Sequence, residues 1–165
     1  MKTLFLVRHA KSSWENFRLS DNERPLNKRG ERDAPRMGKR LALRGVKPDI
    51  LISSPAVRAY STAVKIAAEI DYPEDDIQTK AKLYFEGISE MLDIIHSLKP
   101  EVDIAMLFGH NPTMTEAVNT LAKAAIGNVP TCGIAQIQFD VESWQDVDKG
   151  LGTMLLFDYP KRIDD

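Results

Sequence analysis

Short uninterrupted apolar runs recur along the chain and mark the strands that the sequence predicts. These runs lie within residues 3–7, 49–53 and 104–109. Each is too short for a buried helix and rich in large aliphatic side chains, which is typical of strands covered on both faces of a parallel sheet. The three runs therefore predict the centre of an α/β fold.

Segments with apolar residues at helical spacing separate and follow these strands. Asn27 is the predicted N-cap of the first helix, where Pro35 predicts a bend or a late start. Ser54 and Pro55 predict the start of the second helix, and residues 113–116 form a predicted capping box. The predicted helices cover residues 27–44, 54–70, 88–98 and 113–125.

The pattern changes near the end of the chain. Residues 134–139 alternate apolar and polar positions, and residues 153–157 follow after a turn that contains Gly150 and Gly152. Two such segments predict a hairpin at one side of the sheet. With strands and helices alternating before it, the chain is predicted to form a three-layer α/β/α sandwich with a mostly parallel central sheet.

Length and composition narrow the class of protein. The 165 residues fit one domain, and the composition is ordinary for a soluble globular protein. The first apolar run ends at Arg8, too early for the core of a signal peptide, and no stretch is long enough to span a membrane. Cys132 is the single cysteine, so no intramolecular disulfide can form, and a packed or loop thiol is expected. We expect a cytoplasmic protein.

Charge is distributed unevenly. Residues 1–60 carry 14 Lys and Arg against 6 Asp and Glu, whereas residues 61–165 carry 8 against 18. An anionic ligand is therefore expected at a site built mainly from the first third of the chain. Nucleic acid is a poor candidate, because no aromatic stacking platform or known binding motif accompanies the positive charge.

Ionisable residues stand where the predicted strands end. Arg8 and His9 follow the first strand, and His110 follows the third. Arg58 lies in the first turn of a helix, where the dipole disfavours a cation unless an anion binds nearby. Because parallel strands share one carboxyl edge, these side chains are expected to converge there. His96 is interpreted as a surface or boundary histidine.

Four separated motifs resemble one family. Leu6-Val7-Arg8-His9-Ala10 is similar to the Arg-His-Gly signature of the histidine phosphatase superfamily, with alanine in place of the usual glycine. The resemblance extends over residues 24–26, 53–59 and 109–112 in matching order and covers nearly the whole chain. These motifs and the small size resemble the SixA-type phosphohistidine phosphatases, which implies a phosphoglycerate mutase-like fold.

The resemblance implies a covalent reaction that needs no metal or other cofactor. His9 would attack the phosphoryl group and become phosphohistidine, which water then hydrolyses. Arg8, Arg58 and a protonated His110 would stabilise the equatorial oxygens. Further phosphate contacts are predicted for Lys11, Ser12 and Asn111.

The proton donor is a separate prediction. Glu86 is the candidate, because it lies in a predicted loop after two aromatic residues whose apolar surfaces could raise its pKa. A phosphohistidine substrate would depend less on this acid, since its imidazole leaving group can carry its own proton. Long insertions between the motifs are absent, which favours an open site for a phosphohistidine in a protein partner.

Three other functions remain open. A phosphomonoesterase or mutase acting on a small phosphorylated metabolite would use the same chemistry. A phosphate-binding or scaffolding domain would keep the pocket without catalysis. Metal-dependent hydrolysis through His9 and His110 is disfavoured, because two nearby arginines would repel a divalent cation. The sequence predicts no oligomeric state.

Overall fold

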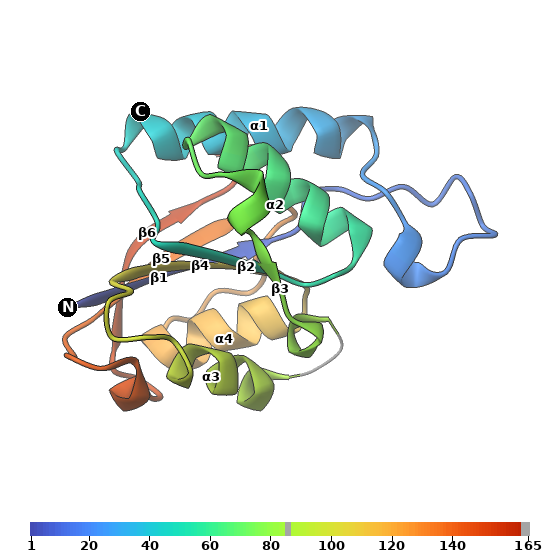
Figure 1. Cartoon of the computed structure of the whole chain (residues 1–165). Coiled ribbons are helices and arrows are strands. Elements are labelled where there is room, and N and C mark those ends of the chain that lie inside the picture. The colour runs from blue at the N-terminus through green and yellow to red at the C-terminus, as the bar shows by residue number, and fades with distance from the viewer. Residues whose placement is uncertain (85–86, 163–165) are drawn as a thin grey trace.

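A central β-sheet lies between two layers of helices (Figure 1). The computed structural model describes residues 1–84 and 87–162. Over these residues the strands have the order β3-β2-β4-β1-β5-β6. Their bounds are Lys2–Arg8 for β1, Ile50–Ser53 for β2, Gln78–Thr79 for β3, Ile104–Gly109 for β4, Ile134–Phe139 for β5 and Gly152–Asp158 for β6. The predicted sandwich is confirmed.

Helices α1 and α2 cover one face of the sheet, and α3 and α4 cover the other (Figure 1). The helices span Lys28–Leu43 for α1, Val57–Glu69 for α2, Ile88–His96 for α3 and Thr113–Ala122 for α4. Because neighbouring side chains of a strand point to opposite faces, β1 contributes to two separate cores. Phe5 and Val7 pack with the α1 and α2 side, whereas Leu4 and Leu6 pack with the α3 and α4 side.

The pairing of β1 sets the position of the residues that follow it. β1 is parallel to β4, with Arg8 opposite Gly109, and antiparallel to β5. The His9 N–H donates to the Gly109 carbonyl at 3.0 Å, which continues the pairing one residue past the strand. His9 and His110 therefore stand next to each other at the carboxyl edge of the sheet, as expected for parallel neighbours.

Several predicted elements are confirmed. Asn27 caps α1 by accepting from the Gly30 N–H at 2.9 Å. β5 and β6 form the predicted antiparallel pair at one side of the sheet. No helix in the described part of the chain combines the length and apolar character needed to cross a membrane.

Other boundaries differ from the prediction for local reasons. α1 runs from Lys28 through Pro35, so of the predicted bend or late start, the late start is wrong. α2 begins at Val57 and not at Ser54, whose hydroxyl accepts from the Ala56 N–H at 3.2 Å before the helix starts. The strand Gln78–Thr79 was not predicted, since two exposed residues carry no apolar pattern.

The start and end of α4 also differ. Its N-cap is Pro112, whose side chain makes no capping hydrogen bond, and not the predicted Thr113. Instead, the Asn111 carboxamide oxygen accepts from the Thr115 N–H at 3.1 Å and its hydroxyl at 2.9 Å. The helix ends at Ala122, where Lys123 takes a left-handed conformation with φ of 49°. Residues 123–125, which the prediction included, therefore lie outside the helix.

Candidate active site

His9 occupies a protected position just beyond β1. Its side chain is buried, and its Nδ1 lies 2.7 Å from the Ala10 carbonyl oxygen. A carbonyl only accepts hydrogen bonds, so Nδ1 carries the proton and Nε2 keeps a lone pair. Burial lowers the pKa of His9 to about 4, and the charges of Arg58 and Arg8 contribute. At neutral pH the imidazole is therefore uncharged and available as a nucleophile through Nε2.

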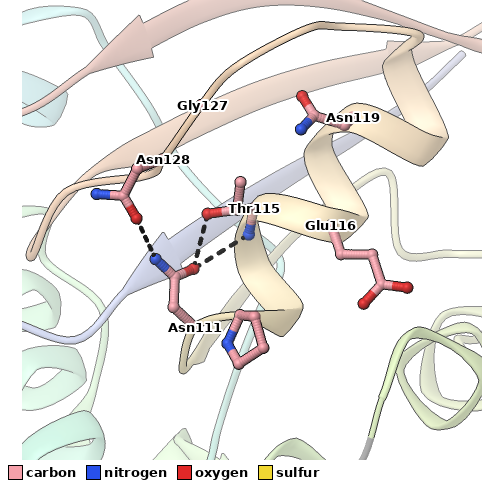
Figure 2. A pocket seen from close by; sticks show the side chains of 7 residues that line it. Asn111, Thr115, Glu116, Asn119, Gly127 and Asn128 are labelled. Atoms are coloured by element: carbon pink, nitrogen blue, oxygen red, sulfur yellow. Dashed lines mark hydrogen bonds between the residues drawn. The ribbon is translucent and has the colours of Figure 1, made fainter.

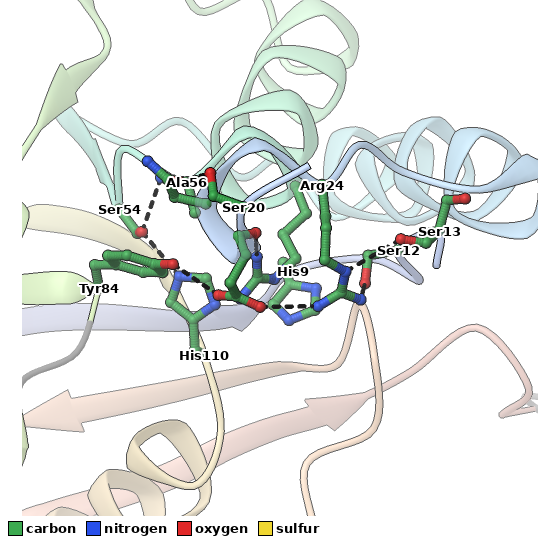
Figure 3. A network of polar contacts seen from close by, with 12 residues as sticks. His9, Ser12, Ser13, Ser20, Arg24, Ser54, Ala56, Tyr84 and His110 are labelled. Carbon is green, nitrogen blue, oxygen red and sulfur yellow. Dashed lines mark hydrogen bonds and ion pairs between the residues drawn. The ribbon is translucent and has the colours of Figure 1, made fainter. Parts of the chain in front are cut away.

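His110 lies beside His9, with the ring centroids 5.1 Å apart (Figure 3). Its Nε2 is 2.8 Å from the Ser54 hydroxyl, and its Nδ1 is buried without a hydrogen-bond partner in the described part of the protein. Burial, followed by the neighbouring His9 and Arg58, lowers the pKa of His110 to about 3. At neutral pH His110 is therefore uncharged in this structure, whereas the sequence-based hypothesis gives it a proton beside a phosphoryl group. A phosphoryl dianion would favour protonation by supplying the opposite charge.

Arg8 is anchored by the loop before β5. Its Nη1 donates to the Val129 carbonyl at 3.0 Å, and burial lowers the pKa of the guanidinium. Its Nε is buried without a hydrogen-bond partner among the described residues. Buried polar atoms without partners are rare and are typical of functional sites. This one and Nδ1 of His110 both belong to the predicted site.

Arg58 is the second residue of α2 and its side chain is buried. Its Nη2 donates to Asp21 Oδ2 at 2.9 Å, and its Nη1 donates to the Asp21 carbonyl oxygen at 2.6 Å. The position of Arg58 in the sequence indicated an anion beside it. In this structure, a carboxylate of the protein itself lies there.

Three further residues surround Arg58 and the paired histidines and were not recognised as functional from the sequence. They are Asp21, Arg24 and Tyr84. Arg24 Nη1 donates to Asp21 Oδ1 at 3.0 Å, and the Tyr84 hydroxyl donates to Asp21 Oδ2 at 2.7 Å. Hydrogen bonds from Tyr84 and the two arginines hold the pKa of Asp21 well below its usual range. Arg24 and Tyr84 face the paired histidines (Figure 3). The Arg24-Pro25-Leu26 motif was the available signal for Arg24.

Positively charged side chains surround a small cavity of about 190 Å³ beside His9. Lys11 and Ser12, which the sequence proposed as phosphate contacts, line it together with His9. The Ser12 hydroxyl accepts a hydrogen bond from Arg24 Nη2. The other lining residues are Arg8, Trp14, Arg24, Arg58 and Thr131.

Asn111 lies apart from this cavity. It lines a larger one of about 530 Å³ beside the start of α4 (Figure 2). Its carboxamide nitrogen donates to Asn128 Oδ1 at 2.9 Å and to the Val129 carbonyl at 3.0 Å, while its oxygen caps α4. The structure therefore places Asn111 in the support of the Val129 loop and not among the phosphate contacts. Glu86, the candidate acid, lies outside the described residues.

Cys132 and the remaining histidine are separate from the site chemistry. Cys132 is a buried free thiol, and burial raises its pKa, as expected for a packed cysteine and not for a reactive thiolate. His96 is partly buried on α3, with Nε2 2.8 Å from the Val147 carbonyl oxygen, which confirms it as a boundary residue. Within residues 1–84 and 87–162, no His, Cys, Asp or Glu side chains group in threes as metal ligands would.

A neutral histidine ringed by arginines at the carboxyl edge of a parallel sheet defines a site for an oxyanion and for nucleophilic attack on it. The profile of the Histidine phosphatase superfamily (branch 1) matches residues 4–84. An uncharacterized chloroplastic protein of Arabidopsis thaliana is 31% identical over 153 residues, which cover 88% of this chain and 70% of that protein. The chain belongs to the histidine phosphatase superfamily.

Solved structures share the whole fold. One described as the phosphohistidine phosphatase SixA of Agrobacterium tumefaciens is 27% identical, with a TM-score of 0.80 over 96% of this chain and 98% of that one. The protein histidine phosphatase SixA in complex with tungstate is 21% identical, with a TM-score of 0.82 over 96% and 97% of the two chains. These matches confirm the predicted phosphoglycerate mutase-like, SixA-type fold, and the family supports a phosphatase activity.

Proposed function

We propose that this phosphatase hydrolyses phosphohistidine in a protein substrate through a covalent phosphohistidine on His9. The observation that carries the proposal is the state of His9, a neutral imidazole whose protonated Nδ1 is held by the Ala10 carbonyl while arginines surround the ring. Two proteins with this fold are described as SixA phosphatases that act on phosphohistidine or on protein histidine, which supports the same substrate class here.

The proposed reaction has two displacements at phosphorus. His9 Nε2 attacks in line, the bond from phosphorus to the substrate imidazole breaks, and that imidazole leaves with a proton. Water then attacks the phosphorylated His9, loses a proton, and releases inorganic phosphate and the neutral histidine. Arg8 and Arg58 stabilise the charge on the equatorial oxygens in both steps. His110 would take up a proton as the dianion binds and add a further positive charge.

The proton for the leaving group has two sources in this proposal. A phosphorylated imidazole can be protonated before it leaves, which lowers the demand for an enzymatic acid. Glu86 remains our candidate donor for substrates with poorer leaving groups. Phosphoesters of alcohols would depend on such a donor more than phosphohistidine does.

Exposed apolar side chains near the cavity support a protein as the substrate. Trp14 lines the cavity and is 73% exposed, and Phe17 in the same segment is 89% exposed. Val57, beside Arg58, is 40% exposed. Large exposed apolar side chains near a binding site are typical of protein interaction surfaces, where aromatic residues supply much of the binding energy. Phe17 and Val57 do not line the cavity of about 190 Å³, so a small metabolite bound inside it would contact only Trp14 of these three side chains.

The covalent step is tested by trapping the phosphorylated enzyme. The full chain is mixed briefly with a ³²P-labelled phosphohistidine protein and quenched in alkali, and the label on the enzyme is then tested for acid lability. The expected label is acid-labile and base-stable. Because the chain has 3 histidines, fragment mass spectrometry can assign it to His9. A stoichiometric label on another residue, or turnover with no labelled enzyme, would overturn the proposed mechanism.

The protein substrate is tested at Phe17. Phe17→Ser is expected to lower kcat/KM for a phosphohistidine protein by about tenfold, the loss of one aromatic contact, and to leave hydrolysis of p-nitrophenyl phosphate unchanged. Leu43→Ser is the matched control, because Leu43 is equally exposed at 89% but ends α1. Equal effects of Phe17→Ser on both substrates would contradict a docking role. Faster turnover of sugar phosphates than of the phosphoprotein would favour the phosphomonoesterase.

A further inference from the structure

Asp21 places a carboxylate of the protein on two cations of the proposed phosphate site. Its Oδ2 accepts from Arg58 Nη2 at 2.9 Å and its Oδ1 accepts from Arg24 Nη1 at 3.0 Å. The Asp21 side chain is 44% exposed, whereas the side chains of Arg58 and Arg24 are each 8% exposed. A partly exposed anion therefore covers two buried cations.

The two anions that Arg58 can bind are chemically alike. Carboxylate and phosphoryl oxygens both accept paired hydrogen bonds from the forked end of a guanidinium. In the free enzyme, both terminal nitrogens of Arg58 donate to Asp21, one to the carboxylate and one to the main-chain oxygen. A phosphoryl oxygen that takes the Nη2 hydrogen now donated to Oδ2 replaces the Asp21 carboxylate, while Nη1 can keep its bond to the main-chain oxygen.

The surroundings show what would hold Asp21 after such a displacement. Arg24 is fixed independently, because its Nε donates to the Ser13 carbonyl at 3.1 Å and its guanidinium carbon lies 3.2 Å from the centre of the Trp14 ring. The Asp21 carboxylate can thus keep its ion pair with Arg24 while it gives up Arg58. A change of side-chain rotamer suffices, and the 3₁₀ turn Asp21–Glu23 can stay in place.

We propose that Asp21 competes with the phosphoryl group for Arg58, so that it weakens oxyanion binding and favours release of inorganic phosphate after hydrolysis. This inference rests on the proposed function, because it assigns Arg58 to the phosphoryl group. It makes Asp21 a residue that tunes affinity, separate from the groups that perform the displacement.

Binding of oxyanions measures the competition without turnover. The affinities of the full chain for inorganic phosphate and for tungstate are compared by titration calorimetry. Asp21→Asn is expected to bind both about tenfold more tightly, because an uncharged amide competes less for a guanidinium. Glu23→Gln is the matched control, since it removes the same charge from the same turn but from a carboxylate that accepts from Ser20. Its affinities should equal those of the wild type.

Two further variants test whether tighter oxyanion binding comes from competition for Arg58 or from a general effect of the substitution. In an Arg58→Ala background, Asp21→Asn should no longer tighten oxyanion binding, because the contested cation is gone. Tyr84→Phe, which removes the hydrogen bond that the Tyr84 hydroxyl donates to Asp21, should tighten binding less than Asp21→Asn does.

Several results would overturn the inference. Weaker or unchanged binding in Asp21→Asn would mean that the carboxylate preorganises the arginines instead of competing. Equal tightening in Glu23→Gln would assign the effect to overall charge. If His9 becomes phosphorylated but Asp21→Asn binds like the wild type, the competition fails and the proposed function stands. If Asp21→Asn binds more tightly and no phosphorylated His9 is found, the proposed mechanism fails and the competition stands.

Discussion

Replacing His9 by alanine is expected to reduce turnover of both a phosphohistidine protein and p-nitrophenyl phosphate by a factor of about 10⁴ or more. His110, the neighbouring histidine, is not expected to substitute for it. His110 keeps Nε2 against the Ser54 hydroxyl, 2.8 Å away, and its Nδ1 is buried. Because the proposed mechanism makes attack by His9 the first step for every substrate, the loss should be the same for both substrates. Steady-state kinetics measure the loss.

The matched control is the remaining histidine. His96→Ala removes an imidazole from α3 that contacts the Val147 carbonyl and does not line the cavity at His9, so it is expected to keep wild-type turnover. Added imidazole should partly restore turnover in His9→Ala and not in Arg58→Ala, because a free ring can occupy the space of the missing nucleophile. If His9→Ala keeps more than about one hundredth of wild-type turnover, another group is the nucleophile.

Sequence patterns predicted the part of the site that belongs to the sheet. Arg8, His9 and His110 end strands whose apolar runs are unambiguous, and parallel pairing then brings the two histidines to one edge. Arg58 was assigned to the site because a cation in the first turn of a helix is disfavoured by the helix dipole unless an anion binds nearby. In these cases a strand or helix that the sequence predicts fixes where the functional side chain lies.

The rest of the cluster comes from segments without periodicity. Asp21 lies in a polar loop, and Tyr84, the donor of its shortest side-chain hydrogen bond, is 63 residues away in the chain. No spacing rule connects two loop residues at that separation, because their contact depends on how the whole sandwich closes. The same limit explains why Asp21 was not identified as the anion beside Arg58.

Asn111 shows how adjacency in sequence misleads at a strand end. It follows His110 directly, so a shared role in phosphate binding was a reasonable expectation. Where a strand ends, the side chains of neighbouring residues can point in different directions. The Asn111 carboxamide caps α4 and donates to the Val129 carbonyl instead. Since Val129 accepts from Arg8, Asn111 supports the site through the backbone of that loop.

Arg58→Ala is expected to lower kcat/KM by about 30-fold to 1000-fold, which corresponds to a loss of about 2 to 4 kcal/mol of transition-state stabilisation. Arg58 is buried beside the proposed nucleophile, where a guanidinium would act on the phosphoryl oxygens with little competition from bulk water. The effect should appear mainly in kcat, because charge on the equatorial oxygens must be stabilised through both displacements. The Asp21 turn remains held by Arg24 in this variant, so the loss reports on Arg58 itself.

Arg58→Lys distinguishes the forked geometry from charge alone. Lysine keeps the positive charge but cannot donate two parallel hydrogen bonds, so we expect most of the alanine effect to persist. Arg40→Lys is the matched control, because Arg40 on α1 also uses both terminal nitrogens, with Asp158 at 3.0 Å and the Tyr159 and Pro160 carbonyls as acceptors. That variant should lower the Tm and leave kcat/KM unchanged. Turnover of Arg58→Ala within tenfold of the wild type would remove Arg58 from the catalytic role, whatever the lysine variant shows.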